Sequence, residues 1–159
     1  MTQSLVRLIT PADVDGVMAA IRLMHAENGL FPLCEAKIRN TINGALNPSI
    51  FYLPTVIGVI GSQDNIEATI CLVVSQLHYT EERHLADVWN FVRPDCRKTA
   101  HNKELLKFAK ECSDNLGLKF LAGVVSGERT DAKIELYRKR VGQVVGALFV
   151  YEPKLKEAI

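Results

Sequence analysis

One segment, from Val92 to Leu106, concentrates more potential chemistry than the rest of the chain. Between positions 93 and 103, four basic residues and one acidic residue give a local charge of +3, which exceeds the net +1 of the whole protein. A strand is expected to end near Pro94 and a helix to begin near Ala100. The first N–H groups of a helix lack partners within it and the helix dipole is positive there, so such a start binds anions. The segment therefore suits a pyrophosphate, although a basic turn is also typical of solvated surface. The cations are Arg93, Arg97, Lys98 and Lys103.

Apolar periodicity and turn residues predict the elements that position this segment. Thr10-Pro11-Ala12-Asp13 has the residues of a capping box, and the helix behind it is expected to run to Asn28-Gly29. A short strand from Leu5 to Ile9 precedes this helix. A second helix is expected from Cys34 to Leu46.

The middle of the chain changes to a strand pattern. Val56 to Ile60 and Ile66 to His78 flank a polar turn and predict an antiparallel hairpin. His84 to Val92 is expected to form the next strand. Strict alternation would place four of its residues on one face, namely Leu85, Asp87, Trp89 and Phe91.

The second half alternates helix and strand. A helix from Ala100 to Leu116 is followed by Leu118 to Val125, whose almost wholly apolar residues are typical of a strand buried on both faces. A helix from Thr130 to Arg140 and a closing strand from Val144 to Tyr151 complete the pattern. The order β-α-α-β-β-β-α-β-α-β predicts one α/β domain over residues 1–159, with a mixed central sheet flanked by helices.

Composition excludes several classes of protein. A chain of 159 residues with 48% hydrophobic and 23% charged residues fits one folded domain and not a disordered protein. The balance of 19 basic and 18 acidic residues argues against a nucleic-acid-binding surface. The longest apolar run, about Val56 to Gly61, is far shorter than the ~20 residues that cross a bilayer. Neither nucleic acid nor a membrane is expected as a partner.

The first residues of the chain and the spacing of its cysteines point to a reducing compartment. The first residues lack the pattern of a secretion signal. The four cysteines are widely spaced without a C-x-x-C pair, so we expect reduced thiols in the cytoplasm and no metal site. Cys96 lies in the basic turn and is interpreted as a packing residue.

Two motifs resemble those of the GCN5-related N-acetyltransferase (GNAT) family. Val92-x-Pro94-x-x-Arg97, followed by a helix with Leu105-Leu106, resembles the family's fourth strand, pyrophosphate loop and third helix. Leu136-Tyr137-x-x-x-x-Gly142 resembles its late Leu-Tyr signature. The element order is also similar, so the resemblance covers nearly the whole chain. The segments also resemble GNAT-type proteins encoded by bacteriophages.

The resemblance implies an acetyl-CoA site where the fourth and fifth strands separate. The pyrophosphate would be held by the main chain from Arg97 to Lys103, and the thioester carbonyl by an N–H near Phe91 or Val92. Ala100 and Asn102 stand where the family usually has glycine, and either residue is tolerated if its backbone allows it. His101 and Asn102 add side-chain donors. The implied cofactor-binding residues are Phe91, Val92, Arg97, Lys98, Thr99, Ala100, His101, Asn102 and Lys103.

The resemblance also implies two catalytic roles. Tyr137 would be the general acid that protonates the departing CoA thiolate, with an amphipathic core tyrosine as the alternative. Asp87 is the preferred general base, since desolvation on its strand would raise its pKa, and His84 is the alternative. A salt-bridged or hydrogen-bonded strand residue is an equally ordinary interpretation of Asp87. Glu27 would attract a cationic amine, or is a solvated surface carboxylate.

The expected function is transfer of an acetyl group from acetyl-CoA to a primary amine of a small molecule, or to a lysine or N-terminus of a protein. The alternative is a non-catalytic GNAT-fold binding or virion-associated module with a degenerate cofactor loop. A homodimer is an expected assembly, and the cytoplasm, or the host cytoplasm for a phage protein, is the expected location.

Overall fold

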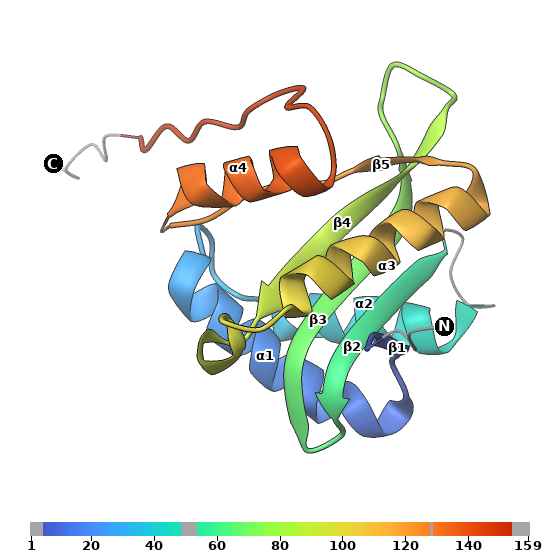
Figure 1. Cartoon of the computed structure of the whole chain (residues 1–159), viewed down its shortest axis with the longest axis vertical. Helices are drawn as coiled ribbons and strands as arrows, with labels where there is room; N and C mark the ends of the chain where they lie inside the picture. Colours follow the sequence, from blue (N-terminus) through green and yellow to red (C-terminus); the bar gives the residue numbers. More distant parts are fainter. Residues whose placement is uncertain (1–4, 49–53, 128, 154–159) are drawn as a thin grey trace, which may run out of the picture.

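A mixed five-stranded sheet forms the centre of the molecule (Figure 1). The computed structural model describes residues 5–48, 54–127 and 129–153. The first four strands are antiparallel neighbours, and the last pairs parallel with the fourth, in the order β1-β2-β3-β4-β5. This confirms the predicted sheet class. The strands are β1 (Arg7–Leu8), β2 (Thr55–Ser62), β3 (Asn65–Gln76), β4 (Arg83–Val92) and β5 (Lys119–Leu121).

Helices cover both faces of this sheet (Figure 1). On one face, α1 (Val14–Asn28) and α2 (Glu35–Leu46) bury apolar residues such as Met18 and Ile42 against β2, β3 and β4. On the other face, α3 (His101–Leu116) buries Leu105 and Ala109 against β3 and β4. A Cβ at Gly58 of β2 would lie 2.9 Å from the Phe108 ring, so α3 approaches the sheet closely only because that position is glycine.

Among the predictions from the sequence, those of helix ends agree best with the structure. A 3-10 turn, η1 (Pro11–Asp13), leads into α1, and α1 ends before Gly29. Gly117 ends α3 in the left-handed conformation, with φ at 64°, where glycine is favoured. The last helix, α4 (Thr130–Arg140), has the predicted bounds. A second 3-10 turn, η3 (Pro94–Cys96), lies between β4 and α3.

A β-bulge in β4 corrects the predicted face of that strand. Asp87 pairs with Leu72 of β3, whereas Trp89 pairs with the next residue, Cys71, so Val88 is the extra residue. Leu72 packs on the α3 face and Cys71 on the α1 face. Asp87 therefore does not share a face with Trp89, as simple alternation predicted, because one inserted residue reverses the alternation.

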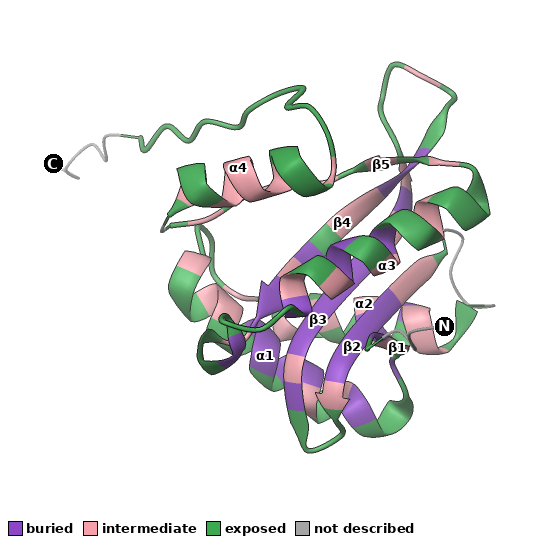
Figure 2. Cartoon of the chain, viewed as in Figure 1, coloured by how far each residue is buried: buried purple, intermediate pink, exposed green. Residues whose placement is uncertain are grey.

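Two predicted strands in the last third are wrong. β5 has three residues instead of the eight of Leu118 to Val125, and Lys119 and Leu121 are exposed, so it is not buried on both faces. The bulge explains the shortening, since the N–H of Gly123 turns to the Asp87 carboxylate instead of extending the ladder. Residues 142–153 have no strand, and their side chains are exposed (Figure 2). Strand propensity at Val144 to Tyr151 does not by itself make a strand, because a strand needs hydrogen bonds to a neighbour and these residues pair with none of the described strands.

The helices also bear on membrane insertion. Among the described residues, no helix has the length and apolar character needed to cross a bilayer.

Candidate active site

The pairing between β4 and β5 stops after three residue pairs, and beyond it the two segments separate. Ala86 pairs with Leu121, and within the described chain the rest of β4 has no partner on this edge. A cleft of about 470 Å³ opens there, between residues 87–92 of β4 and residues 123–125. The second half of α1 and one face of α4 complete its walls. The separation creates a site because it leaves strand backbone and side chains unpaired around an open volume.

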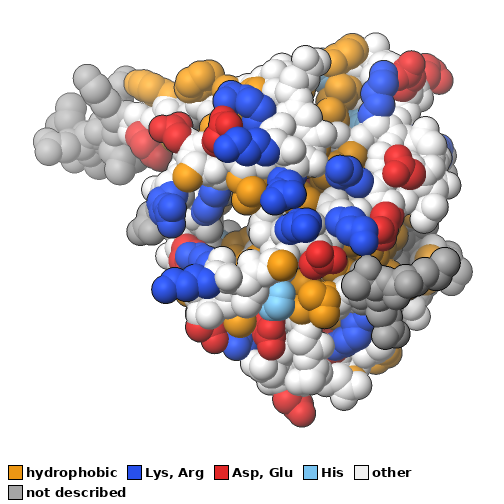
Figure 3. Space-filling view, in the orientation of Figure 1, with side chains coloured by type: hydrophobic (Ala, Val, Ile, Leu, Met, Phe, Trp, Pro, Cys, Tyr) orange, Lys and Arg blue, Asp and Glu red, His pale blue; other side chains and the backbone are white. Residues whose placement is uncertain are grey.

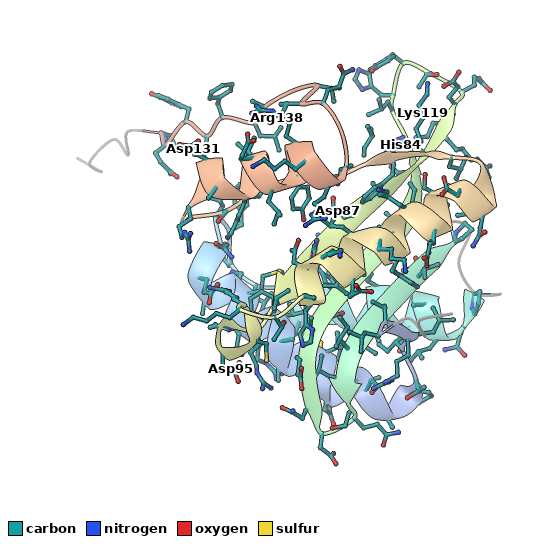
Figure 4. All side chains as sticks on the ribbon, viewed as in Figure 1. His84, Asp87, Asp95, Lys119, Asp131 and Arg138 are labelled. Carbon is teal, nitrogen blue, oxygen red and sulfur yellow. The ribbon has the colours of Figure 1, made fainter. Side chains whose placement is uncertain are left out.

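Asp87 stands where the strands separate, between β4 and α4 (Figure 4). Its Oδ1 accepts a hydrogen bond of 2.8 Å from the N–H of Gly123. Burial raises the pKa of Asp87 from 3.8 to about 6, and the Gly123 hydrogen bond opposes this only in part. No cation of the described chain forms an ion pair with Asp87. A carboxylate with this pKa is ionised at neutral pH and is a stronger base than an ordinary aspartate.

Tyr137 of α4 faces the same cleft. Its hydroxyl oxygen accepts a hydrogen bond of 2.7 Å from Nδ2 of Asn90 on β4. Because the oxygen accepts this bond, the phenolic proton remains available to donate. Burial, with the Asp87 charge as a second cause, raises the pKa of Tyr137 well above its usual value, so it stays protonated at neutral pH. Asn90 and Asp87 share the α3 face of the bulged strand, since they pair with Ile70 and Leu72.

The basic turn reaches the cleft through Arg97. Its Nη2 lies 2.5 Å from the Glu27 carboxylate at the end of α1, and its Nε donates to the carbonyl of Val92 at 3.3 Å. The guanidinium also lies 5.9 Å from the centre of the Phe91 ring. Glu27 is thus an exposed carboxylate whose charge is paired with Arg97, and it is not free to attract an amine. The surrounding lysines and arginines gather on the face that carries α3 and α4 (Figure 3).

Backbone N–H groups at the start of α3 are unpaired. Within the described residues, no group accepts a hydrogen bond from the N–H of Lys98, Ala100, Asn102 or Lys103. Three others in the predicted loop are engaged, because Arg97, Thr99 and His101 donate to Pro94, Cys96 and the Thr99 hydroxyl. Ala100 has φ at −81°, and Asn102 is helical, so neither position requires glycine. The departures from the glycine pattern therefore leave these N–H groups unpaired, as an anion site at a helix start requires.

The β4 backbone offers one further donor. The N–H of Arg93 donates to Glu67 of β3 at 2.9 Å. Because N–H groups alternate between the two edges of a strand, the N–H of Val92 turns to the opposite edge, which is the cleft. The carbonyl of Val92 accepts from Arg97 on that same side. Val92, and not Phe91, therefore presents the backbone donor in the predicted position.

Two histidines considered from the sequence lie outside the cleft. His84 pairs in register with Lys119, before the strands separate, and is buried (Figure 4). His101 is also buried, and its Nε2 lies 2.6 Å from the Glu67 carboxylate on β3. The imidazole of His101 is therefore directed to β3, whereas the amide of Asn102 lines the cleft with a buried Oδ1 that has no partner among the described residues.

Sequence reasoning missed Asn90 and Lys133, which both line the cleft. Asn90 is recognisable only once the bulge is known, since simple alternation turns it away from Asp87. Lys133 lies four residues before Tyr137, a helical spacing that could have placed it on the same face of α4.

Comparisons with solved structures show which fold the chain has. A predicted acetyltransferase with acetyl-CoA from Clostridium acetobutylicum superposes with a TM-score of 0.70 at 13% identity, over 92% of this chain and 94% of that one. A Trypanosoma brucei acetyltransferase gives 0.65 at 16% identity, over 93% and 98%. AAC(6')-Iy in complex with the bisubstrate analogue CoA-S-monomethyl-acetylneamine gives 0.68 at 10% identity, over 94% and 97%. The fold is the GNAT acetyltransferase fold. No protein-family model and no curated protein matches the chain.

Proposed function

We propose that the protein is an N-acetyltransferase that moves the acetyl group of acetyl-CoA to a primary amine. One observation carries the proposal. A cleft between separated strands brings together a carboxylate with a raised pKa and a protonated tyrosine, and through Arg97 and Asn102 it adjoins the turn whose backbone donors are unpaired. The GNAT fold supports it, since similar structures hold acetyl-CoA or a CoA-linked bisubstrate analogue.

The acetyl-CoA would lie along the separated edge of β4. Its pyrophosphate suits the four unpaired N–H groups from Lys98 to Lys103, strengthened by the dipole of α3 and the exposed Lys98 and Lys103 side chains. The thioester carbonyl would accept from the N–H of Val92, where negative charge develops on the oxygen during attack. Arg97 supports the turn through its bonds to Glu27 and Val92 and is a positioning residue.

Asp87 and Tyr137 would divide the proton transfers. Asp87 takes a proton from the ammonium group, which leaves a neutral amine with a lone pair for attack on the thioester carbon. The tetrahedral intermediate then collapses, the carbon–sulfur bond breaks, and the sulfur leaves with its electron pair. Tyr137 donates its phenolic proton to that sulfur, the proton that the new amide nitrogen loses re-forms the phenol through solvent, and Asp87 releases its own proton to solvent. Both residues line the same cleft, and the Asp87 charge contributes, after burial, to the raised pKa of Tyr137.

The acceptor side of the cleft is mostly apolar. Its walls include Ile21, Met24 and Leu33, and Asp87 is the one carboxylate among the described lining residues. Lys133 and Arg97 contribute positive charge there. This lining favours an amine on an apolar body, either a small molecule or a protein lysine or N-terminus, over an acceptor with many cationic groups.

Calorimetric titration with acetyl-CoA tests the cofactor site. We expect saturable binding, and we expect Asn102→Asp to weaken it at least tenfold, because the new carboxylate lies among the donors for the pyrophosphate. Asn115→Asp, the same change at the other end of α3, is the matched control and should bind as the parent does. Absence of binding by the parent chain would favour the non-catalytic module. Release of CoA thiol in the presence of an amine panel then tests the transfer itself.

We propose further that the chain forms a homodimer through residues 142–153. Leu148 and Phe149 are 87% and 94% exposed, and β5 leaves one edge open, so the apolar segment and the free edge suit pairing between two copies. Light scattering should then give twice the monomer mass, and Leu148→Lys should shift it to the monomer. The alternative outcome is a monomer at all concentrations.

We place the activity in the cytoplasm, or in the host cytoplasm if a bacteriophage encodes the protein. All four cysteines carry free thiols, which suits a reducing compartment.

A further inference from the structure

Three side chains with metal-binding atoms meet behind the basic turn, outside the cleft. Glu67 comes from β3, Cys96 from η3, and His101 is the first residue of α3. One ligand atom from each lies within 4.8 Å of the other two. Cys96 and His101 are each 9% exposed and the Glu67 side chain is 31% exposed, so two of the three ligands are held within the fold and the third remains open to solvent.

The cluster is not satisfied by its own contacts. Nε2 of His101 lies 2.6 Å from the Glu67 carboxylate, but Nδ1 of His101 is buried and has no partner among the described residues. The thiol of Cys96 makes one long contact, 3.7 Å to the exposed Asp95. A buried polar atom without a partner costs free energy, and a thiol, an imidazole and a carboxylate packed together are rarely kept for packing alone.

Ligand type restricts the ion that would fit. Thiolate and imidazole prefer Zn²⁺ and other late first-row metals, whereas Mg²⁺ and Ca²⁺ require oxygen ligands. With metal–ligand bonds of about 2.0–2.3 Å in tetrahedral geometry, ligand atoms lie about 3.3–3.6 Å apart. The Glu67–His101 pair must therefore open slightly and Cys96 must approach, which side-chain rotation can supply. A thiolate and a carboxylate also neutralise a divalent ion.

We propose that Glu67, Cys96 and His101 form a three-residue site for Zn²⁺ or a similar transition-metal ion, with a water molecule as the fourth ligand. On binding, the Cys96 thiol loses its proton to solvent and sulfur, nitrogen and oxygen each donate an electron pair to the metal. The ion joins β3 to both ends of the turn from residue 96 to residue 101. This site is structural, since none of its residues lines the cleft.

Cobalt titration of the full chain tests the site, because Co²⁺ takes the geometry of Zn²⁺ and is coloured. We expect one Co²⁺ per chain, a thiolate-to-cobalt charge-transfer band, tetrahedral visible bands and displacement by Zn²⁺. Zn²⁺ should also raise the Tm. Cys96→Ser should remove the charge-transfer band and weaken Zn²⁺ binding at least a hundredfold.

Two further variants separate this site from other thiols and from folding defects. Cys34→Ser, which removes an exposed thiol elsewhere, should leave the spectrum unchanged. Glu67→Gln should keep the charge-transfer band but weaken binding at least tenfold. The Tm of each variant in the presence of a chelator reports its folding. Absence of the band in the parent chain, or its persistence in Cys96→Ser, would overturn the proposal. Neither outcome bears on acetyl transfer.

Discussion

Two aspartates, the buried Asp13 and the partly buried Asp87, show how differently the same side chain behaves in two parts of this molecule. Asp13, at the start of α1, is 0% exposed and accepts two hydrogen bonds of 2.7 Å from the Arg7 guanidinium. The N–H and the hydroxyl of Thr10 each donate to it at 2.8 Å. These bonds, with Arg7 as the largest cause, lower the pKa of Asp13 to about 2.

Asp87, in the cleft, is partly buried but forms no ion pair with a cation of the described chain. One backbone N–H at 2.8 Å is its partner outside its own residue, and its pKa rises to about 6. Burial alone therefore does not determine the behaviour of a carboxylate. The number and charge of its donors decide whether it stabilises the fold or is held ready for proton transfer.

The largest expected effect separates the two residues by activity. Asp87→Asn keeps the shape and can still accept from Gly123, but it removes the proposed base, so we expect kcat to fall roughly 10²–10⁴-fold. Steady-state kinetics on an accepted amine would measure this. Asp131→Asn, on the exposed start of α4 (Figure 4), is the matched control and should retain parental activity. Parental activity of Asp87→Asn would show that Asp87 is not the base.

For the free energy of unfolding we expect the opposite: the substitution of Asp13, and not that of Asp87, should destabilise the protein. Asp13→Asn removes the charge partner of Arg7, which keeps the Gly61 carbonyl as an acceptor and is itself 38% exposed, so we expect a loss of about 2 kcal/mol in the free energy of unfolding. Urea denaturation measures it. The folded-state pKa lies below the unfolded value of 3.8, so the loss should shrink as pH falls from 3.8 towards about 2. At temperatures where the variant is folded, kcat should be unchanged. A loss under about 1 kcal/mol would mean that the ion pair contributes no more than an exposed one.

The contribution of Asp87 to stability changes with pH in the opposite direction to that of Asp13. Its folded-state pKa of about 6 exceeds the unfolded 3.8, so the folded protein binds the extra proton in between, and stability falls as pH rises through this window. Asp87→Asn should therefore be more stable than the parent by about 2 kcal/mol near pH 8, with the gain lost near pH 4. The parent's kcat/KM should rise with an apparent pKa of about 6. A gain in stability independent of pH would contradict the burial of a charged Asp87.

The smallest expected effect on kcat is that of substituting Tyr137, which lines the same cleft as Asp87. Tyr137→Phe removes the proposed proton donor, while the leaving thiolate can still take a proton from water, so we expect kcat to fall about tenfold with little change in KM. Tyr151→Phe, in the exposed residues 142–153, is the control. Unchanged kcat in Tyr137→Phe would leave Tyr137 as a packing residue bonded to Asn90.

Local signals in the sequence predicted much of the fold. Thr10-Pro11-Ala12-Asp13 and Gly117 mark real helix ends because capping and left-handed conformations depend on a few adjacent residues. Residues 142–153 show where such signals fail, since a strand requires a partner edge that no local pattern reveals.

The site was predictable only in outline. The basic turn after β4 was recognisable from its residue types, and the Leu136-Tyr137 pair from its resemblance to a GNAT motif. The Asn90–Tyr137 bond and the contact of Glu67 with His101 join residues 47 and 34 positions apart. These meetings depend on the register of β3 and β4, which the bulge shifts by one residue, and periodicity does not show where a bulge lies.

The bulged residue, Val88, also affects the course of β4 beside the cleft. By adding one residue to β4, it exchanges odd and even positions for everything that follows, so Asp87 and Asn90 share a face although three positions separate them. Deleting Val88 would leave Asp87 and Asn90 two positions apart and still on one face, paired with Leu72 and Ile70, but it would remove the bulge and the local bend and twist that a bulge gives its strand. The extra residue therefore acts on the direction of β4 directly after its last pair with β5, Ala86–Leu121, which is where the cleft opens.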